Sequence, residues 1–188
     1  MYTENMLDSE SPLRSKLPQD QLELIDQGFT ILKHANDDKS HKYDDYSFTV
    51  FPFAKAYEGF LKIVFLQAGY ISREEYLSKF FRIGKVMSPN LRKRLGRNSV
   101  YERICQSVGC EISDLIWKAW KRGRNQVFHY FPDNIQSITL QEAEDIAHAI
   151  VSTMEKVVTT VQMDEVKKRL ADLSMHEIKR LRQEKEAI

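Results

Sequence analysis

The stretch "FPFAKAYEGFLKIVFLQAGY", residues 51–70, decides the fold. Apolar side chains occupy nearly every face of a helix drawn through it, whereas a surface helix keeps one polar face. The stretch therefore predicts a central helix that is buried on most sides, and Gly69 marks its expected end. Glu58 lies inside this helix and needs a cationic partner, because an unpaired buried charge is costly.

Helical patterns continue on both sides of this stretch. Before it, residues 18–35 place apolar side chains at helical intervals. After it, a Ser or Thr is followed three positions later by Glu at three places, which is the pattern of an N-terminal capping box. The pairs open helices expected over 72–87, over 99–109 and from 139 onward, and they are Ser72 with Glu75, Ser99 with Glu102, and Thr139 with Glu142.

A longer amphipathic helix is expected over residues 111–130. Pro132 ends it, because proline disfavours helical geometry at the residue before it. No alternation of the kind that strands show persists anywhere in the chain. The predicted fold class is therefore all-α.

The chain has 188 residues, which fits one domain. Residues 1–17 are rich in Ser, Glu and Pro and are expected to form a mobile N-terminal segment. A helical domain is expected over 18–162. A highly charged helix is expected over 163–188.

Composition predicts a soluble, cytoplasmic protein. The N-terminus lacks the basic start and apolar run of a signal peptide, and the apolar run at 63–66 is far too short to span a membrane. Cys105 and Cys110 are too few for a disulfide framework, so they are expected to be buried or inert thiols in a reducing interior. No cluster of Asp, Glu, His or Cys has the spacing of a metal site, so neither a metal nor another cofactor is expected.

The net charge of +1 favours no class of partner, but the basic residues are unevenly distributed. Residues 76–101 contain seven bases and no acid. Such a run is either a solvated loop or a surface that attracts the phosphates of RNA. Phe80 and Phe81 are expected to belong to the core and not to stack on bases. The bases are Lys79, Arg82, Lys85, Arg92, Lys93, Arg94 and Arg97.

A second stretch, "RGRNQVFHYFP" at 122–132, contains candidate catalytic residues. Arg124 and His129 have the spacing "Arg, four to six residues, His" that marks HEPN ribonucleases. Short motifs also arise by chance, and the pairs Arg122 with His129 and Arg169 with His176 fit the same spacing. The alternative reading is a surface arginine and a histidine at a helix end.

Context favours Arg124. Asn125 follows it directly and lies four residues before His129, so both would share a helix face. Glu58, in the buried helix, has two kinds of candidate partner. Lys55 and Lys62 lie at helical spacing, and Arg124 or His129 could reach it from the long helix.

The helix containing "KAYEGFLK" and the later "RNQVFH" resemble the C-terminal domain of RNase LS-type toxins of toxin–antitoxin systems. The resemblance covers roughly residues 46–160. It implies a HEPN-like helical bundle, a homodimer with a composite active site, metal-independent cleavage of RNA, and an antitoxin protein as a possible partner. It implies catalytic roles for Arg124, His129, Glu58 and Asn125.

The basic residues would then bind the RNA substrate, namely Lys85, Arg92, Lys93, Arg94, Arg97 and Arg122. An alternative function is a non-catalytic HEPN-like module that binds a partner protein or a nucleotide.

One geometric difficulty accompanies the motif. Five residues along a straight helix turn the direction of a side chain by about 140°, so Arg124 and His129 cannot both face one small site. Either the end of this helix is distorted, or two subunits share the site. The second explanation is preferred, because it agrees with the implied dimer.

Overall fold

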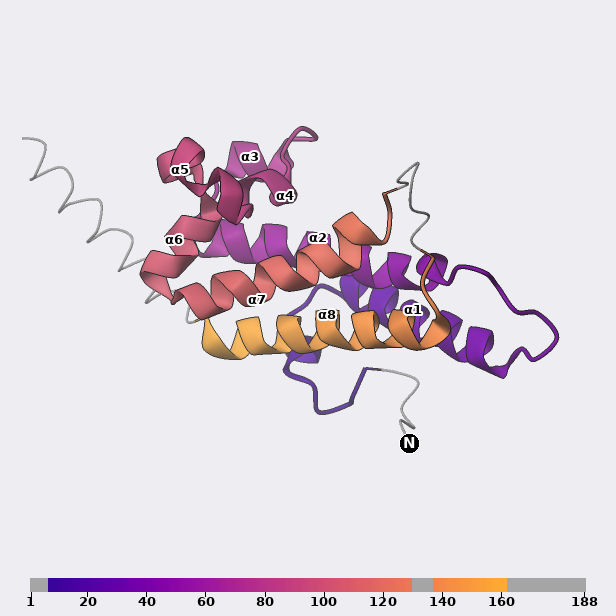
Figure 1. Ribbon diagram of the computed structural model, residues 1–188. Coiled ribbons are helices and arrows are strands. Elements are labelled where there is room, and N and C mark those ends of the chain that lie inside the picture. Colours follow the sequence, from indigo (N-terminus) through magenta and orange to yellow (C-terminus); the bar gives the residue numbers. More distant parts are fainter. Residues whose placement is uncertain (1–6, 130–136, 162–188) are drawn as a thin grey trace, which may run out of the picture.

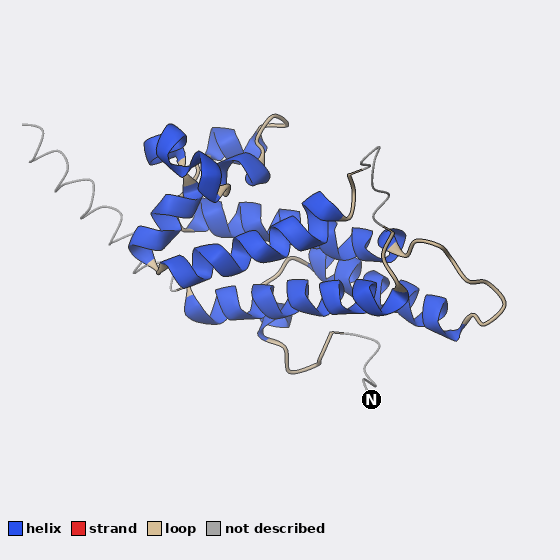
Figure 2. Ribbon diagram, viewed as in Figure 1, coloured by secondary structure: helices blue, strands red, loops and turns tan. Residues whose placement is uncertain are grey.

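The apolar stretch forms the long helix α2 (Ser47–Gln67), which lies at the centre of the molecule. The computed structural model describes residues 7–129 and 137–161, and these contain helices and no strand (Figure 2). The all-α prediction is therefore confirmed. The remaining helices are α1 (Gln19–Asp37), α3 (Arg73–Leu77), α4 (Ile83–Val86), α5 (Arg92–Leu95), α6 (Val100–Ser107), α7 (Cys110–Trp120) and α8 (Leu140–Thr160), with the short helices η1 (Pro12–Ser15), η2 (Pro89–Leu91), η3 (Gly96–Asn98) and η4 (Lys121–Gln126) between them.

Four long helices, α1, α2, α7 and α8, pack along one another (Figure 1). The core between them includes the fully buried side chains of Phe53, Leu61 and Phe65 from α2, Ile116 from α7 and Met154 from α8. The short helices α3, α4 and α5 form a lobe alongside the C-terminal part of α2 (Figure 1). None of the helices in the described part of the chain is long and apolar enough to cross a membrane.

Two of the capping boxes form as predicted. The Ser72 side chain accepts from the backbone of Glu75 at the start of α3, and Thr139 does the same with Glu142 at the start of α8. The single helix expected over 72–87 is nevertheless wrong. The chain forms the short helices α3 and α4 there, with a turn between them.

Residues 7–17 are packed, where a mobile segment is predicted. Leu7, Leu13 and Leu17 are buried, and the hydroxyl of Ser11 donates a 2.6 Å hydrogen bond to Glu155 of α8. Three leucines within a Ser- and Pro-rich stretch are enough to hold it on the core. Residues 1–6 and the charged helix expected over 163–188 lie outside the described residues.

The prediction of free thiols is also wrong. Cys105 and Cys110 form a disulfide between the last turn of α6 and the first residue of α7. The turn between the two helices passes through Gly109 with φ +134°, a conformation that favours glycine. This turn brings the two Cα atoms to 4.0 Å, a proximity that five positions of sequence separation do not reveal.

Asp45 joins the starts of two long helices. Its Oδ1 accepts from the backbone N–H of Ser47 at 3.0 Å, at the start of α2, and from that of Ile138 at 3.1 Å, just before α8. Burial alone would raise the pKa of Asp45, but the hydrogen bonds from Ser47 and Ile138 lower it below its ordinary value. The carboxylate therefore fixes where α8 begins relative to α2.

A close approach between α1 and α2 gives a test of this core. A Cβ added to Gly28 of α1 would lie 2.5 Å from a ring carbon of Phe53, whose side chain is fully buried. Gly28→Ala is expected to lower the free energy of unfolding by roughly 1–3 kcal/mol, measured by urea denaturation, because the ring has no room to move. The double variant Gly28→Ala/Phe53→Leu should lose less than the sum of its single changes. Strict additivity would contradict the contact.

Candidate active site

The helix that begins at α7 does not remain an α-helix to its end. Residues Lys121–Gln126 form the π-helical segment η4, in which backbone hydrogen bonds span five residues in place of four. The helix ends at Gln126, so the predicted end near 130 is too late, and Pro132 lies outside the described residues. The distortion that could resolve the Arg124–His129 difficulty is therefore present, and sharing of the site between two subunits stays a prediction.

Close packing against α8 holds this π-helical segment in place. Gly123 is buried, and a Cβ on it would lie 2.6 Å from the Cδ1 of Ile150. The absence of a side chain lets the segment approach α8. Trp120, at the start of the segment, is buried and presents its ring to Arg124 at 5.7 Å from the guanidinium carbon.

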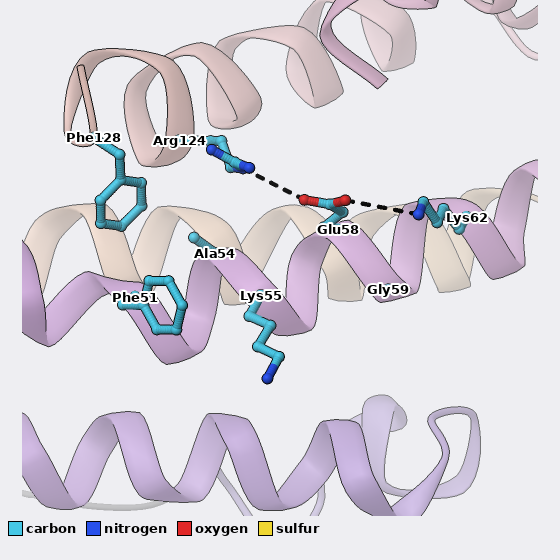
Figure 3. A pocket seen from close by; sticks show the side chains of 8 residues that line it. All are labelled: Phe51, Ala54, Lys55, Glu58, Gly59, Lys62, Arg124 and Phe128. Carbon is cyan, nitrogen blue, oxygen red and sulfur yellow. Dashed lines mark hydrogen bonds and ion pairs between the residues drawn. The ribbon is translucent and has the colours of Figure 1, made fainter. Parts of the chain in front are cut away.

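Glu58 and Arg124 meet across the space between α2 and η4 (Figure 3). The Nε of Arg124 lies 3.4 Å from one carboxylate oxygen of Glu58, and the Nζ of Lys62 lies 3.7 Å from the other. Of the candidate partners in the sequence, Arg124 and Lys62 are therefore the ones that pair with Glu58, while Lys55 points away from the carboxylate. The side chains of Glu58 and Arg124 are 34% and 41% exposed, so a ligand can reach both.

A cavity of about 520 Å³ opens beside this ion pair. Phe51 and Phe128 form its apolar wall, with their rings edge to face at 5.9 Å. The charged end of the cavity contains Glu58, Lys62 and Arg124. The arrangement can hold an anion at Arg124 and Lys62 and an apolar or aromatic group against the phenylalanines.

Arg122 lies on a different side of η4 from Arg124. It lines a smaller cavity of about 160 Å³ between α7, η4 and α8. The pKa of Glu142 lies below its ordinary value, mainly because the backbone and side chain of Thr139 donate hydrogen bonds to it, and the nearby charge of Arg122 contributes to the same shift. The structure thus places Arg124, and not Arg122, beside Glu58.

Asn125 and His129 are not among the residues that line the cavity. Asn125 faces α4, where a Cβ on Gly84 would lie 3.8 Å from its Nδ2. His129 is exposed and comes three residues after the helix ends, so the prediction that it shares a helix face with Asn125 is wrong. It directly follows Phe128, which lines the cavity, in the sequence.

The predicted RNA-binding residues are exposed. Lys85 is on α4, Arg92, Lys93 and Arg94 are on α5, and Arg97 is on η3. Arg92 forms an ion pair with Glu102 of α6. The lobe that presents these charges contacts the site through Gly84, because a Cβ there would lie 3.1 Å from the Nε1 of Trp120.

The prediction that Phe80 belongs to the core is wrong. Its side chain is 75% exposed, whereas Phe81 packs against the core as expected. Helical spacing over 72–87 could not reveal this, because the turn between α3 and α4 changes which side chains face inward.

No group of three or more His, Cys, Asp or Glu side chains within residues 7–129 and 137–161 is arranged to hold a metal ion. No family model, curated protein or solved structure matches the chain.

Proposed function

We propose that the chain is a metal-independent endoribonuclease of the HEPN type, a toxin or phage-defence effector. The observation that supports this most is the pairing of Glu58 with Arg124. Residues from two helices 66 positions apart meet at a π-helical segment, beside a cavity that can hold an anion. Distortions of this kind occur frequently at functional sites.

RNA contains its own nucleophile, the 2′-hydroxyl. In the proposed reaction the 2′-oxygen forms a bond to the adjacent phosphorus, and the bond from phosphorus to the 5′-oxygen breaks. Arg124 binds the phosphoryl oxygens and stabilises the negative charge that builds on them. His129 gives a proton to the departing 5′-oxygen, while water takes the proton of the 2′-hydroxyl.

The other proposed residues position these groups. Glu58 orients the guanidinium of Arg124 through the ion pair at 3.4 Å. Asn125 faces Gly84 of α4 in the basic lobe, where it would donate a hydrogen bond to the RNA backbone. A second subunit would bring another copy of His129 to the same site, and an antitoxin protein would inhibit the enzyme by covering the cavity.

The products distinguish this chemistry from hydrolysis. We expect a 2′,3′-cyclic phosphate and a 5′-hydroxyl at the cut, activity that persists in EDTA, and no cleavage of DNA or of RNA with a 2′-O-methyl group at the cut. Purified protein with an end-labelled RNA, followed by mass spectrometry of the fragments, measures all of these. Products with a 5′-phosphate, or activity that EDTA removes and magnesium restores, would show that the proposed mechanism is wrong.

A second candidate function is a non-catalytic module that binds a partner protein or a nucleotide. It is favoured by the exposed position of His129 outside the cavity and by the aromatic wall of Phe51 and Phe128, which suits a base or an apolar side chain. A protein that binds its partner tightly but leaves every RNA intact, alone and as a dimer, would favour this candidate.

A further inference from the structure

The turn between α3 and α4 presents an aromatic ring to solvent on a fixed backbone. The guanidinium of Arg82 donates hydrogen bonds to the carbonyls of Lys79 at 2.8 Å and Phe81 at 3.3 Å, one on each side of Phe80. The backbone N–H of Phe80 donates to the hydroxyl of Ser78 at 3.1 Å. Phe81 packs on the core, so the ring of Phe80 is held outward with little freedom in the backbone.

Among the described residues, the ring of Phe80 neither belongs to the hydrophobic core nor packs against it. Phe80 is the most exposed large apolar residue there, and Leu77, at the end of α3, lies close to it in sequence and is almost as exposed. The Nζ of Lys79 lies 5.3 Å from the centre of the Phe80 ring, within the range of a cation–π contact. An exposed aromatic side chain beside a cation is what a binding site for a nucleic-acid base with its phosphate requires.

The exposed charge on the lobe is strongly one-sided. Lys85, Lys93 and Arg94 are exposed and form no ion pair among the described residues, and Arg82 adds another positive charge at the turn. Two acids lie nearby on α3, Glu74 and Glu75, and Glu75 is engaged in the capping box with Ser72. The lobe therefore attracts a polyanion, which distinguishes it from an ordinary apolar docking face.

A single strand fits these features better than a duplex. An unpaired strand exposes the faces of its bases together with its phosphates, whereas a duplex keeps its bases stacked inside. Stacking on Phe80 needs an exposed base face, and the cations of α4 and α5 need phosphates of the same strand.

We propose that the lobe of α3, α4 and α5 binds single-stranded RNA, with one base stacked on Phe80 and phosphates held by Lys79, Lys85, Lys93 and Arg94. The choice of RNA over DNA rests on the proposed function. The lobe contacts the site through Gly84 and Trp120. A strand bound on it would therefore be directed toward η4, which contains Arg124.

Binding is measured separately from cleavage. The full-length protein is titrated against a fluorescein-labelled, 2′-O-methylated RNA of about twelve nucleotides, which the proposed reaction cannot cut, and Kd is read from fluorescence anisotropy. Phe80→Ala is expected to raise Kd by about 5- to 100-fold, because base stacking on an aromatic side chain is lost. Phe80→Trp should bind at least as tightly as the wild type.

The control variant is Phe48→Ala. The side chain of Phe48 is also exposed, at 46%. It lies in the first turn of α2, whereas the lobe lies near the other end of this helix, about 30 Å away. Its change should leave Kd as it is. The variant Lys93→Glu/Arg94→Glu should weaken binding and reduce the dependence of Kd on salt concentration.

Several results would overturn the inference. They are an unchanged Kd for Phe80→Ala, a duplex that binds as tightly as the single strand, and a wild type that does not bind the strand at all. The last result would point to an acidic protein as the occupant of the lobe. A protein that binds through Phe80 but never cleaves RNA supports the inference and counts against the proposed function. Cleavage at an unchanged rate in Phe80→Ala supports the proposed function and counts against the inference.

Discussion

Arg124→Ala is expected to lower the rate of RNA cleavage by about 100- to 1000-fold, because it removes the group that stabilises charge on the phosphoryl oxygens. The free energy of unfolding should change by less than about 1 kcal/mol, since the ion pair with Glu58 is partly exposed. The rate is measured with a fluorogenic RNA at saturating concentration, and folding by thermal denaturation. His129→Ala should give a similar loss of rate with the fold intact.

Lys121→Ala is the matched control, because Lys121 is an exposed base in the same segment η4 and does not line the cavity beside Glu58. It should cleave like the wild type. Arg124→Lys keeps the charge but loses the bidentate contact with phosphate, so it should cleave faster than Arg124→Ala and more slowly than the wild type. Cleavage by Arg124→Ala at the wild-type rate would remove Arg124 from the reaction. Failure of both Arg124 variants to fold would assign the residue a structural role.

The largest loss of stability is expected from Phe53→Ala, at about 3–5 kcal/mol in the free energy of unfolding. The ring of Phe53 is fully buried, and it packs edge to face on Phe29 with the ring centres 5.0 Å apart. Truncation would leave a cavity between α1 and α2 that the rigid packing of two helices cannot close. Urea denaturation measures the change.

Phe51→Ala provides the comparison within the same helix. Phe51 is 57% exposed and lies two positions before Phe53, so its loss should cost about 1 kcal/mol or less. Equal losses from the two variants would mean that α2 does not face the core as described.

Local rules were sufficient for much of the fold. The burial of α2 follows from an apolar run with no polar face, and the starts of α3 and α8 follow from capping boxes that depend on four consecutive positions. The partners of Glu58 could also be anticipated, because a carboxylate in an apolar helix needs a cation and few are within reach.

Features that depend on contacts between distant segments were not accessible in this way. The π-helical segment depends on the packing of Gly123 against Ile150, and nothing in residues 121–126 alone distinguishes it from an α-helix. The division of 72–87 into α3 and α4, with Phe80 exposed, depends on how these helices pack on α2 and, through Gly84, on Trp120. The disulfide depends on the turn at Gly109.

In the proposed mechanism, the ion pair at the site would also make RNA binding an exchange reaction. At rest the guanidinium of Arg124 already has an anionic ligand, the carboxylate of Glu58, so a phosphate has to displace that ligand before it gains the full contact. Lys62 remains 3.7 Å from the other carboxylate oxygen, so Glu58 keeps a counter-ion after Arg124 has turned to the substrate. The need to displace Glu58 would weaken the affinity for a free anion such as phosphate. It would favour a polyanion whose neighbouring phosphates are bound elsewhere on the protein. Selectivity for a long strand over free phosphate then follows from competition inside the site.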